Sequence, residues 1–151
     1  MDFDWNEQQQ ELRQGAKRFA AERLCEGIAE RERQGRFDRE LWRACAEFGL
    51  QGMPLPEAYG GAAHDPLTMA AILEGIGLGG RDNGLIFSLG AHLWACTMPL
   101  ALFGSEAQKA RWLPGMADGT LVAANGMTEA DSGSNAYALR TTATLDGDHY
   151  V

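Results

Sequence analysis

A short loop of small and polar residues holds the side chains best suited to bind a ligand. It covers residues 126–135 and reads GMTEADSGSN. It follows an apolar run, residues 121–124, which predicts a buried strand. Residues without bulk let backbone N–H groups approach a ligand, and successive N–H groups can form an anion-binding nest. The pattern is therefore typical of a site for a phosphate-bearing planar cofactor.

One hydroxyl side chain lies near the start of this loop and another near its end. Thr128 and Ser134 lie six residues apart, too far to serve one ligand atom. They either contact two ends of an extended ligand or only shape a turn. Glu129 and Asp131 could form a pair of carboxylates, but an Asp in a loop more often bonds its own backbone than acts as an acid or base.

Other motifs have simpler explanations. The glycines of residues 75–80 close a predicted helix, whereas a dinucleotide loop follows a strand and opens one, so they indicate a flexible helix end. His92 and Cys96 have the spacing of metal ligands, but their apolar neighbours favour a core histidine that is hydrogen-bonded within the protein. No metal ligand and no catalytic residue is assigned in this chain.

Composition limits the partners and the compartment. The formal net charge of -8 argues against nucleic acid or an anionic membrane. Cys25, Cys45 and Cys96 are odd in number and widely spaced, which indicates reduced thiols. Residues 1–5 are acidic and lack a signal-peptide pattern, and no stretch approaches the length of a membrane span. The sequence therefore predicts a cytoplasmic protein without a membrane span.

Apolar periodicity predicts five helices in the first 120 residues. The first predicted helix covers residues 6–33 and is capped by Asp4 or Asn6, and the second covers residues 38–48 and is closed by Gly49. The third runs from Pro66 through Ile76 and is capped by Asp65. The fourth, residues 84–103, is apolar all round and so predicted to be buried, and a short fifth helix follows Ser105 and is halted by Pro114. Ser105 and Gln108 have the spacing of a capping box.

A change of pattern follows the last helix. Residues 121–127 and 141–145 are predicted strands, and a turn at 146–148 leads to a return strand at 149–151. A chain that ends in a sheet of only two or three strands leaves an open edge, which is unfavourable. We therefore expect this chain to be cut off from a longer protein.

Four strings occur in a fixed order along the chain. They are PEAYGG at 56–61, FGSEAQK at 103–109, WLPGMADG at 112–119, and GMTE at 126–129 followed by Gly133 and Ser134. With them the sequence resembles the acyl-CoA dehydrogenase family of flavoproteins along its whole length. The last string matches the family's Thr-Glu-x-x-x-Gly-Ser-Asp loop except at Asn135, and Ala130 and Asp131 stand where the family usually has Pro and Gly.

The resemblance implies a mainly α fold. Residues 1–120 would form the family's N-terminal all-helical domain, and residues 121–151 would begin its middle β-barrel domain. The family's C-terminal four-helix bundle is absent from this chain. The resemblance also implies FAD, held between the β-domain and the C-terminal helices.

The resemblance implies a role for six residues of the loop region. Asn125 and Gly126 would lie at the edge of the flavin, and the Met127 backbone with the Thr128 backbone and hydroxyl would face its ring. Gly133 and Ser134 would reach toward the pyrophosphate, and Ser134 also toward the bound thioester substrate. Donors at the N1–C2=O edge favour reduction of a flavin, because negative charge develops there.

The activity implied is that of an FAD-dependent acyl-thioester dehydrogenase. A carboxylate base removes the α-proton while the β-hydride goes to FAD, forming a 2,3-double bond; that base is expected beyond Val151. The carrier is coenzyme A or a carrier protein, and an electron-accepting flavoprotein and a homo-dimer or tetramer are expected. The wall of the acyl pocket would come from residues 87–94, for which plain packing is an equal alternative.

Two other functions stay open at this point. The same fold supports flavin oxidases and monooxygenases, because reactivity with oxygen depends on access to the flavin face. The chain could also be a non-catalytic helical fragment that binds only a partner subunit. All three keep the same fold class.

Overall fold

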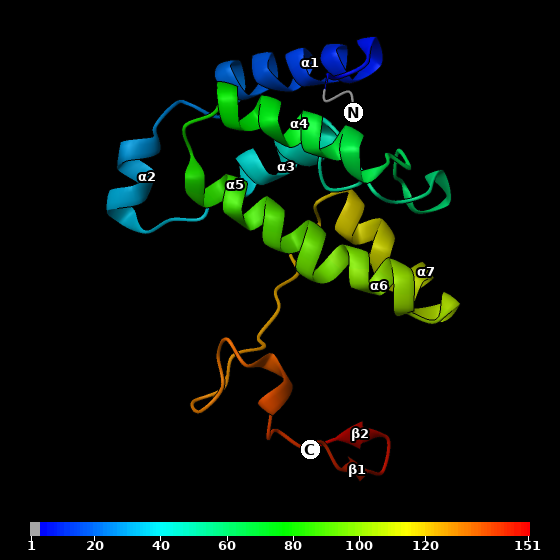
Figure 1. Ribbon diagram of the computed structural model, residues 1–151. Coiled ribbons are helices and arrows are strands. Elements are labelled where there is room, and N and C mark those ends of the chain that lie inside the picture. The colour runs from blue at the N-terminus through cyan, green and yellow to red at the C-terminus, as the bar shows by residue number, and fades with distance from the viewer. Residues whose placement is uncertain (1–3) are drawn as a thin grey trace.

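The computed structural model describes residues 4–151, so the first three residues of the acidic N-terminal segment lie outside the described residues. A body of helices carries an extended C-terminal segment that leaves it, drawn in orange and red in Figure 1. The elements are α1 (Glu7–Arg23), α2 (Ile28–Gln34), α3 (Arg39–Glu47), η1 (Glu57–Tyr59), α4 (Pro66–Gly79), α5 (Asn83–Gly90), η2 (Ala91–Thr97), α6 (Met98–Phe103), α7 (Glu106–Ala117), η3 (Ala136–Ala138), β1 (Leu145–Asp146) and β2 (His149–Tyr150). The mainly α fold class is confirmed.

Helix starts follow the local sequence. The Asn6 side chain accepts from the Gln9 backbone N–H at 2.8 Å, and the Gln9 side chain accepts from the Asn6 N–H at 3.1 Å. Ser105 and Gln108 form the same reciprocal pair at the start of α7. Asp65 caps α4 by accepting from two backbone N–H groups. Each cap satisfies donors that have no partner inside the helix, which is why these starts were predicted correctly.

The predicted helix over residues 6–33 is two helices. The chain turns after α1 because Gly27 adopts a left-handed φ of 68°, which no continuing α-helix contains. Arg31 of α2 then donates to the Glu26 carbonyl and forms a 2.8 Å ion pair with Asp82. These bonds hold α2 against the start of α5, so tertiary contacts override the continuous apolar periodicity.

Pro114 does not halt the last helix, which runs on to Ala117. A proline inside a helix removes the N–H that would bond four residues back, to Ala110. Ala110 is exposed, so water can solvate its carbonyl and the helix continues. The predicted stop at Gly49 is confirmed, with a left-handed φ of 93° after α3.

Helices α1 and α4 lie side by side and touch through glycine (Figure 1). A Cβ on Gly75 would lie 2.3 Å from the Arg13 carbonyl oxygen, and one on Gly79 would lie 2.1 Å from that of Lys17. The glycine-rich end of α4 is therefore a close-packing surface and not the flexible helix end that the sequence predicted. The two backbones approach so closely that no side chain fits between them.

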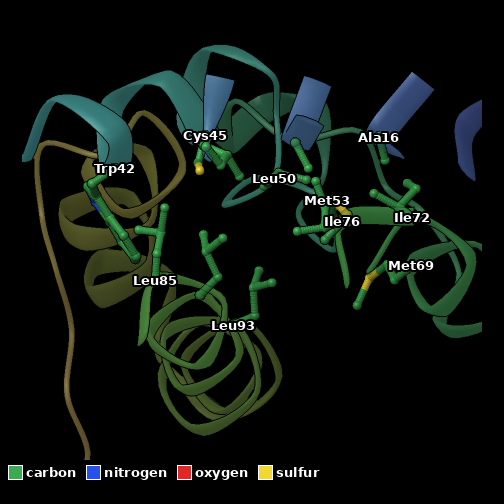
Figure 2. Packing of buried hydrophobic residues seen from close by; sticks show 13 residues of the cluster. Ala16, Trp42, Cys45, Leu50, Met53, Met69, Ile72, Ile76, Leu85 and Leu93 are labelled. Atoms are coloured by element: carbon green, nitrogen blue, oxygen red, sulfur yellow. The ribbon is translucent and has the colours of Figure 1, made fainter. Parts of the chain in front are cut away.

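The main apolar core lies where α1, α3, α4 and the long helix formed by α5 and η2 meet (Figure 2). Its fully buried members include Ala16, Ala20, Leu24, Trp42, Cys45, Leu50, Ile76, Leu89 and Leu93. Burial of each such leucine or isoleucine contributes about 1.5–3 kcal/mol. Burial, followed by the nearby charge of Asp82, raises the pKa of the Cys45 thiol to about 12, so this thiol stays protonated.

Elements α5, η2 and α6 form one continuous helix, Asn83–Phe103, of 21 residues. It was predicted to be buried all round, but only one face is, through Leu85, Leu89 and Leu93. On the other face Phe87 is 80% exposed, and Phe103 at the helix end is 85% exposed. By length and composition alone this helix could cross a membrane, although the sequence predicted no stretch of that length; core helices of other proteins pass the same test.

The C-terminal segment contains less strand than predicted. Residues 121–127 form no strand, and Leu121 and Val122 are 36% and 40% exposed. A strand needs a neighbour that satisfies its backbone, and none lies beside this segment among residues 4–151. The predicted hairpin is confirmed but short: β1 and β2 pair antiparallel, with Leu145 opposite Tyr150, across a turn at Gly147.

We predict that Gly79→Ala destabilises the protein by about 1–3 kcal/mol, because the new methyl group meets the α1 backbone. Gly77 on the same helix has no atom within 4 Å of an added Cβ. Gly77→Ala should therefore stabilise by about 0.5–1 kcal/mol through its lower entropy cost. Urea unfolding measures both values, and equal effects would contradict the close contact of the two helices.

Candidate functional site

The loop of residues 126–135 is reached through a segment that is tied to the helical body. The Leu121 N–H donates to the Gly115 carbonyl at 2.8 Å. The Ala123 N–H donates to Nδ1 of His92 at 3.2 Å, and Nδ2 of Asn125 donates to the Ala95 carbonyl, also at 3.2 Å. These bonds replace the strand ladder that was predicted for this segment. They fix where the loop begins.

His92 lies in the core, with no exposed surface. Its Nε2 is 3.1 Å from the Met116 carbonyl oxygen, and its ring packs edge to face on Trp42 with the centroids 5.1 Å apart. Burial lowers the pKa of His92 below its usual 6.5, and the Met116 bond opposes this shift only in part. The interpretation as a hydrogen-bonded core histidine is confirmed, and Cys96 is not its partner.

A π-turn in the long helix explains the bond from Asn125. Element η2 contains wider turns, in which the Met98 N–H bonds the Leu93 carbonyl five residues back. Pro99 has no N–H, so it does not donate to the Ala95 carbonyl four residues before it. Asn125 supplies a donor instead. This turn was not predicted from the sequence, although Pro99 inside an apolar helix is the signal that could have indicated it.

The loop itself closes on a tight turn. Glu129 and Ser132 exchange backbone hydrogen bonds of 2.9 and 3.3 Å across Ala130 and Asp131. The hydroxyl of Ser132, a buried residue, donates to the Asn135 carbonyl at 2.6 Å. Ala130 and Asp131, where the family usually has Pro and Gly, thus occupy the tip of this turn. The turn keeps the two halves of the loop together.

Glu129 is the anchor of the loop. Its carboxylate accepts from the backbone N–H groups of Arg140 and Thr141, each at 2.8 Å, and from the Thr141 hydroxyl. The Thr141 side chain and these backbone donors lower the pKa of Glu129, so it remains ionised. From the sequence, Glu129 was weighed only as an acid or base, and its anchoring role was not predicted. Asp131 pairs with Arg140 at 3.7 Å and does not cap its own backbone.

The residues predicted to bind a ligand lie on the exposed part of the loop. Met127, Thr128, Gly133 and Ser134 are exposed. Among residues 4–151 neither the Thr128 nor the Ser134 hydroxyl has a hydrogen-bond partner, and nothing lies within 4 Å of a Cβ built on Gly126 or Gly133. Donors without internal partners, on a backbone held at both ends, fit a ligand with several acceptors. Asn125 differs, because its side chain already bonds the helix.

An apolar hollow of about 320 Å³ adjoins the start of the segment. Its lining comes from η2, α6, α7 and the segment, and includes Leu100, Trp112 and Leu121. The predicted pocket wall, residues 87–94, belongs to the same long helix, where Phe87 and Trp94 are exposed. Residues 4–151 hold no group of three or more side chains arranged to bind a metal ion.

We predict that Glu129→Gln loosens the loop, because a neutral amide accepts more weakly and places an N–H against the donors of Arg140 and Thr141. Amide hydrogen exchange of residues 138–142 should become faster. In the wild type the anchoring is fully present above the ordinary pKa of 4.5 and is lost as the pH falls through the lowered pKa of the folded state. Asp131→Asn is the control, since its exposed ion pair contributes little. Equal acceleration by both substitutions would refute the anchor.

The chain matches the family model for the N-terminal domain of acyl-CoA dehydrogenases over residues 6–120. It is 39% identical over 143 residues to the L-prolyl-(peptidyl-carrier protein) dehydrogenase of Serratia sp., covering 95% of this chain and 37% of that protein. The chain thus spans less than two fifths of this relative's length.

Solved structures show the same similarity. The structure of the prolyl acyl carrier protein oxidase AnaB has a TM-score of 0.92 and 44% identity, covering 98% of this chain and 39% of that one. The structure of PigA with FAD and proline has a TM-score of 0.93 and 38% identity, covering 100% of this chain and 39% of that one. The resemblance found in the sequence is confirmed: the chain belongs to the acyl-CoA dehydrogenase family.

Proposed function

We propose that this chain is the N-terminal part of an FAD-dependent oxidoreductase that acts on acyl thioesters and forms a 2,3-double bond. The observation that carries the proposal is the loop of residues 126–135, which presents hydroxyl and N–H donors without internal partners and is fixed at both ends. In this proposal residues 1–120 form a helical domain and residues 121–151 open a β-domain. A carboxylate base outside this chain takes the α-proton.

The residues present fit FAD as the cofactor, and a structural relative is solved with FAD. When bound, FAD accepts the hydride from the β-carbon. The N–H groups of Met127 and Thr128, with the Thr128 hydroxyl, would donate to the ring, and Gly126 would lie at its edge. Gly133 and Ser134 would donate to the pyrophosphate, with Ser134 also near the thioester. Residues of low bulk leave these donors accessible.

Asn125 has a different part in the proposal. One N–H of its Nδ2 donates to the Ala95 carbonyl, so its side chain positions the loop, while the second Nδ2 hydrogen, Oδ1 and the backbone remain for the flavin edge. Donors held rigidly contribute more than mobile ones, because they need no reorganisation as negative charge develops on the ligand. The ties at Ala123 and Asn125 supply this rigidity.

For the substrate we propose an aminoacyl thioester on a carrier protein, with prolyl as the first acyl group to test. The support is the name of a relative that is 39% identical and acts on L-prolyl-(peptidyl-carrier protein). Coenzyme A thioesters are the alternative. A cytoplasmic location, a homo-oligomeric state and an electron-accepting flavoprotein partner stay predictions.

An oxidase is the second candidate function, since a structural relative with 44% identity is a prolyl acyl carrier protein oxidase. An oxidase differs from a dehydrogenase in the acceptor to which the flavin passes its electrons. Oxygen would then replace an electron-accepting flavoprotein.

We predict that the full-length protein, kept anaerobic, loses its oxidised flavin absorbance faster with prolyl carrier protein than with butyryl-CoA. Both thioesters offer an acidic α-proton, so the difference measures recognition of the acyl group and its carrier. Reoxidation on admitting air within seconds would favour the oxidase, and slow reoxidation the dehydrogenase. Absence of bleaching with every thioester tested would refute the proposed function.

We predict that Thr128→Ala in the full-length protein weakens FAD binding about 2- to 10-fold, the equivalent of one hydrogen bond of about 0.5–1.5 kcal/mol. Equilibrium titration of the apoprotein with FAD measures the change. Thr142→Ala is the matched control, because Thr142 is an exposed threonine outside the loop. If the two variants bind FAD equally well, Thr128 is only a turn residue.

A further inference from the structure

We propose that His92 is a positioning residue for the cofactor loop: as a neutral imidazole with its proton on Nε2, it clamps residues 121–125 to the helical body. The consequence of the clamp, which is the placement of Met127 and Thr128 for the cofactor, rests on the proposed function. The clamp itself rests on the contacts of His92 alone. His92 does not touch the loop and acts only through Ala123.

The two neighbours of the ring fix its tautomer. The Met116 carbonyl, 3.1 Å from Nε2, only accepts hydrogen bonds, so Nε2 must carry the proton. The Ala123 N–H, 3.2 Å from Nδ1, only donates, so Nδ1 must present its lone pair. The imidazole therefore bridges α7 and the segment that leads to the loop. No other protonation state satisfies both neighbours.

Protonation would break one side of this bridge. A proton on Nδ1 would face the Ala123 N–H, so two donors would oppose each other, while the Met116 bond would survive. Ala123 would then be released from the helix. Three residues separate Ala123 from Met127, and of the described contacts of this stretch only the one from Asn125 would still tie it to the long helix.

The groups around His92 keep it neutral near pH 7. Trp42 packs on its ring from α3, and the two thiols on the adjoining elements are Cys45 of α3 and Cys96 of the same helix. Burial raises the pKa of both thiols, that of Cys45 to about 12, so neither supplies a negative charge. Nothing on these groups favours an imidazolium.

The charged groups on the elements packed against His92 are exposed to solvent or already paired. The charged side chains of α3 and α7 are exposed, apart from the half-buried Lys109. Residues 120–125 contain no charged side chain. Asp82, at the start of the same long helix, pairs with Arg31 at 2.8 Å. The clamp is consequently present above pH 6.5, and it is lost as the pH falls through the lowered pKa of folded His92.

Hydrogen exchange of the full-length protein without FAD tests the clamp directly. In the wild-type protein, lowering the pH protonates His92 without any substitution. After correction for intrinsic exchange rates, a peptide covering residues 121–125 should then exchange about tenfold faster. His92→Phe should remove the protection at every pH. His92→Gln should restore it, because the amide can accept from Ala123 and donate to Met116, and should abolish its pH dependence. His149→Gln, at an exposed histidine, is the control.

Titration with FAD then tests the consequence. Weaker FAD binding by His92→Phe, with recovery in His92→Gln, supports the positioning role. Exchange of residues 121–125 that is independent of pH and unchanged in His92→Phe would overturn the clamp. Altered exchange with unaltered FAD affinity would overturn the positioning role. A wild-type protein that binds no FAD yet shows the expected exchange would contradict the proposed function while supporting the clamp.

Discussion

The candidate site depends on one constraint: backbone hydrogen bonds must be satisfied where the long helix departs from regular α geometry. The π-turn of η2 and the missing N–H of Pro99 leave the helix with irregular partners around Ala95. Ala95 is half-buried, and a backbone carbonyl that is shielded from water needs a donor, so one from elsewhere in the chain is favoured. Asn125 supplies it. The defect in one helix thereby determines where the loop starts.

This arrangement links the core to the site through few intermediates. Trp42 packs on His92, His92 bonds Ala123, and Ala123 precedes the loop by a few residues. At the other end the ionised Glu129 gathers the donors of residues 140–141. A neutral group therefore holds the chain before the loop and a charged group holds it at Glu129, with the exposed donors of Met127 and Thr128 between these two ties. Salt would weaken the second tie more than the first.

Features that depend on a few neighbouring residues could be predicted from the sequence. The caps at Asn6, Asp65 and Ser105 are of this kind, because the donors that they satisfy lie two or three residues away. The resemblance located the loop for the same reason, as its strings are short. The break at Gly27 could not be predicted, since the stabilising partner of α2 is Asp82, far along the chain. The predicted strand over residues 121–127 was wrong because a strand depends on a partner, and apolar residues alone do not provide one.

The glycines show the same distinction between local features, which can be predicted, and features that depend on distant residues, which cannot. Gly49 was identified correctly because a left-handed residue after a helix is a local requirement. Gly75 and Gly79 were misinterpreted as flexible because their role depends on α1, which lies some sixty residues earlier in the sequence. No atom from elsewhere in the described chain lies within 4 Å of a Cβ built on Gly126 or Gly133, and the roles of these two glycines stay predictions from the resemblance.

The burial of Cys45 gives the molecule an internal reporter. Alkylating reagents attack thiolates, and a thiol with no exposed surface and a pKa of about 12 offers neither access nor thiolate. Cys25 and Cys96 are only partly covered. Slow labelling at Cys45 would therefore time the opening of the folded core, at a natural residue and without any engineered probe.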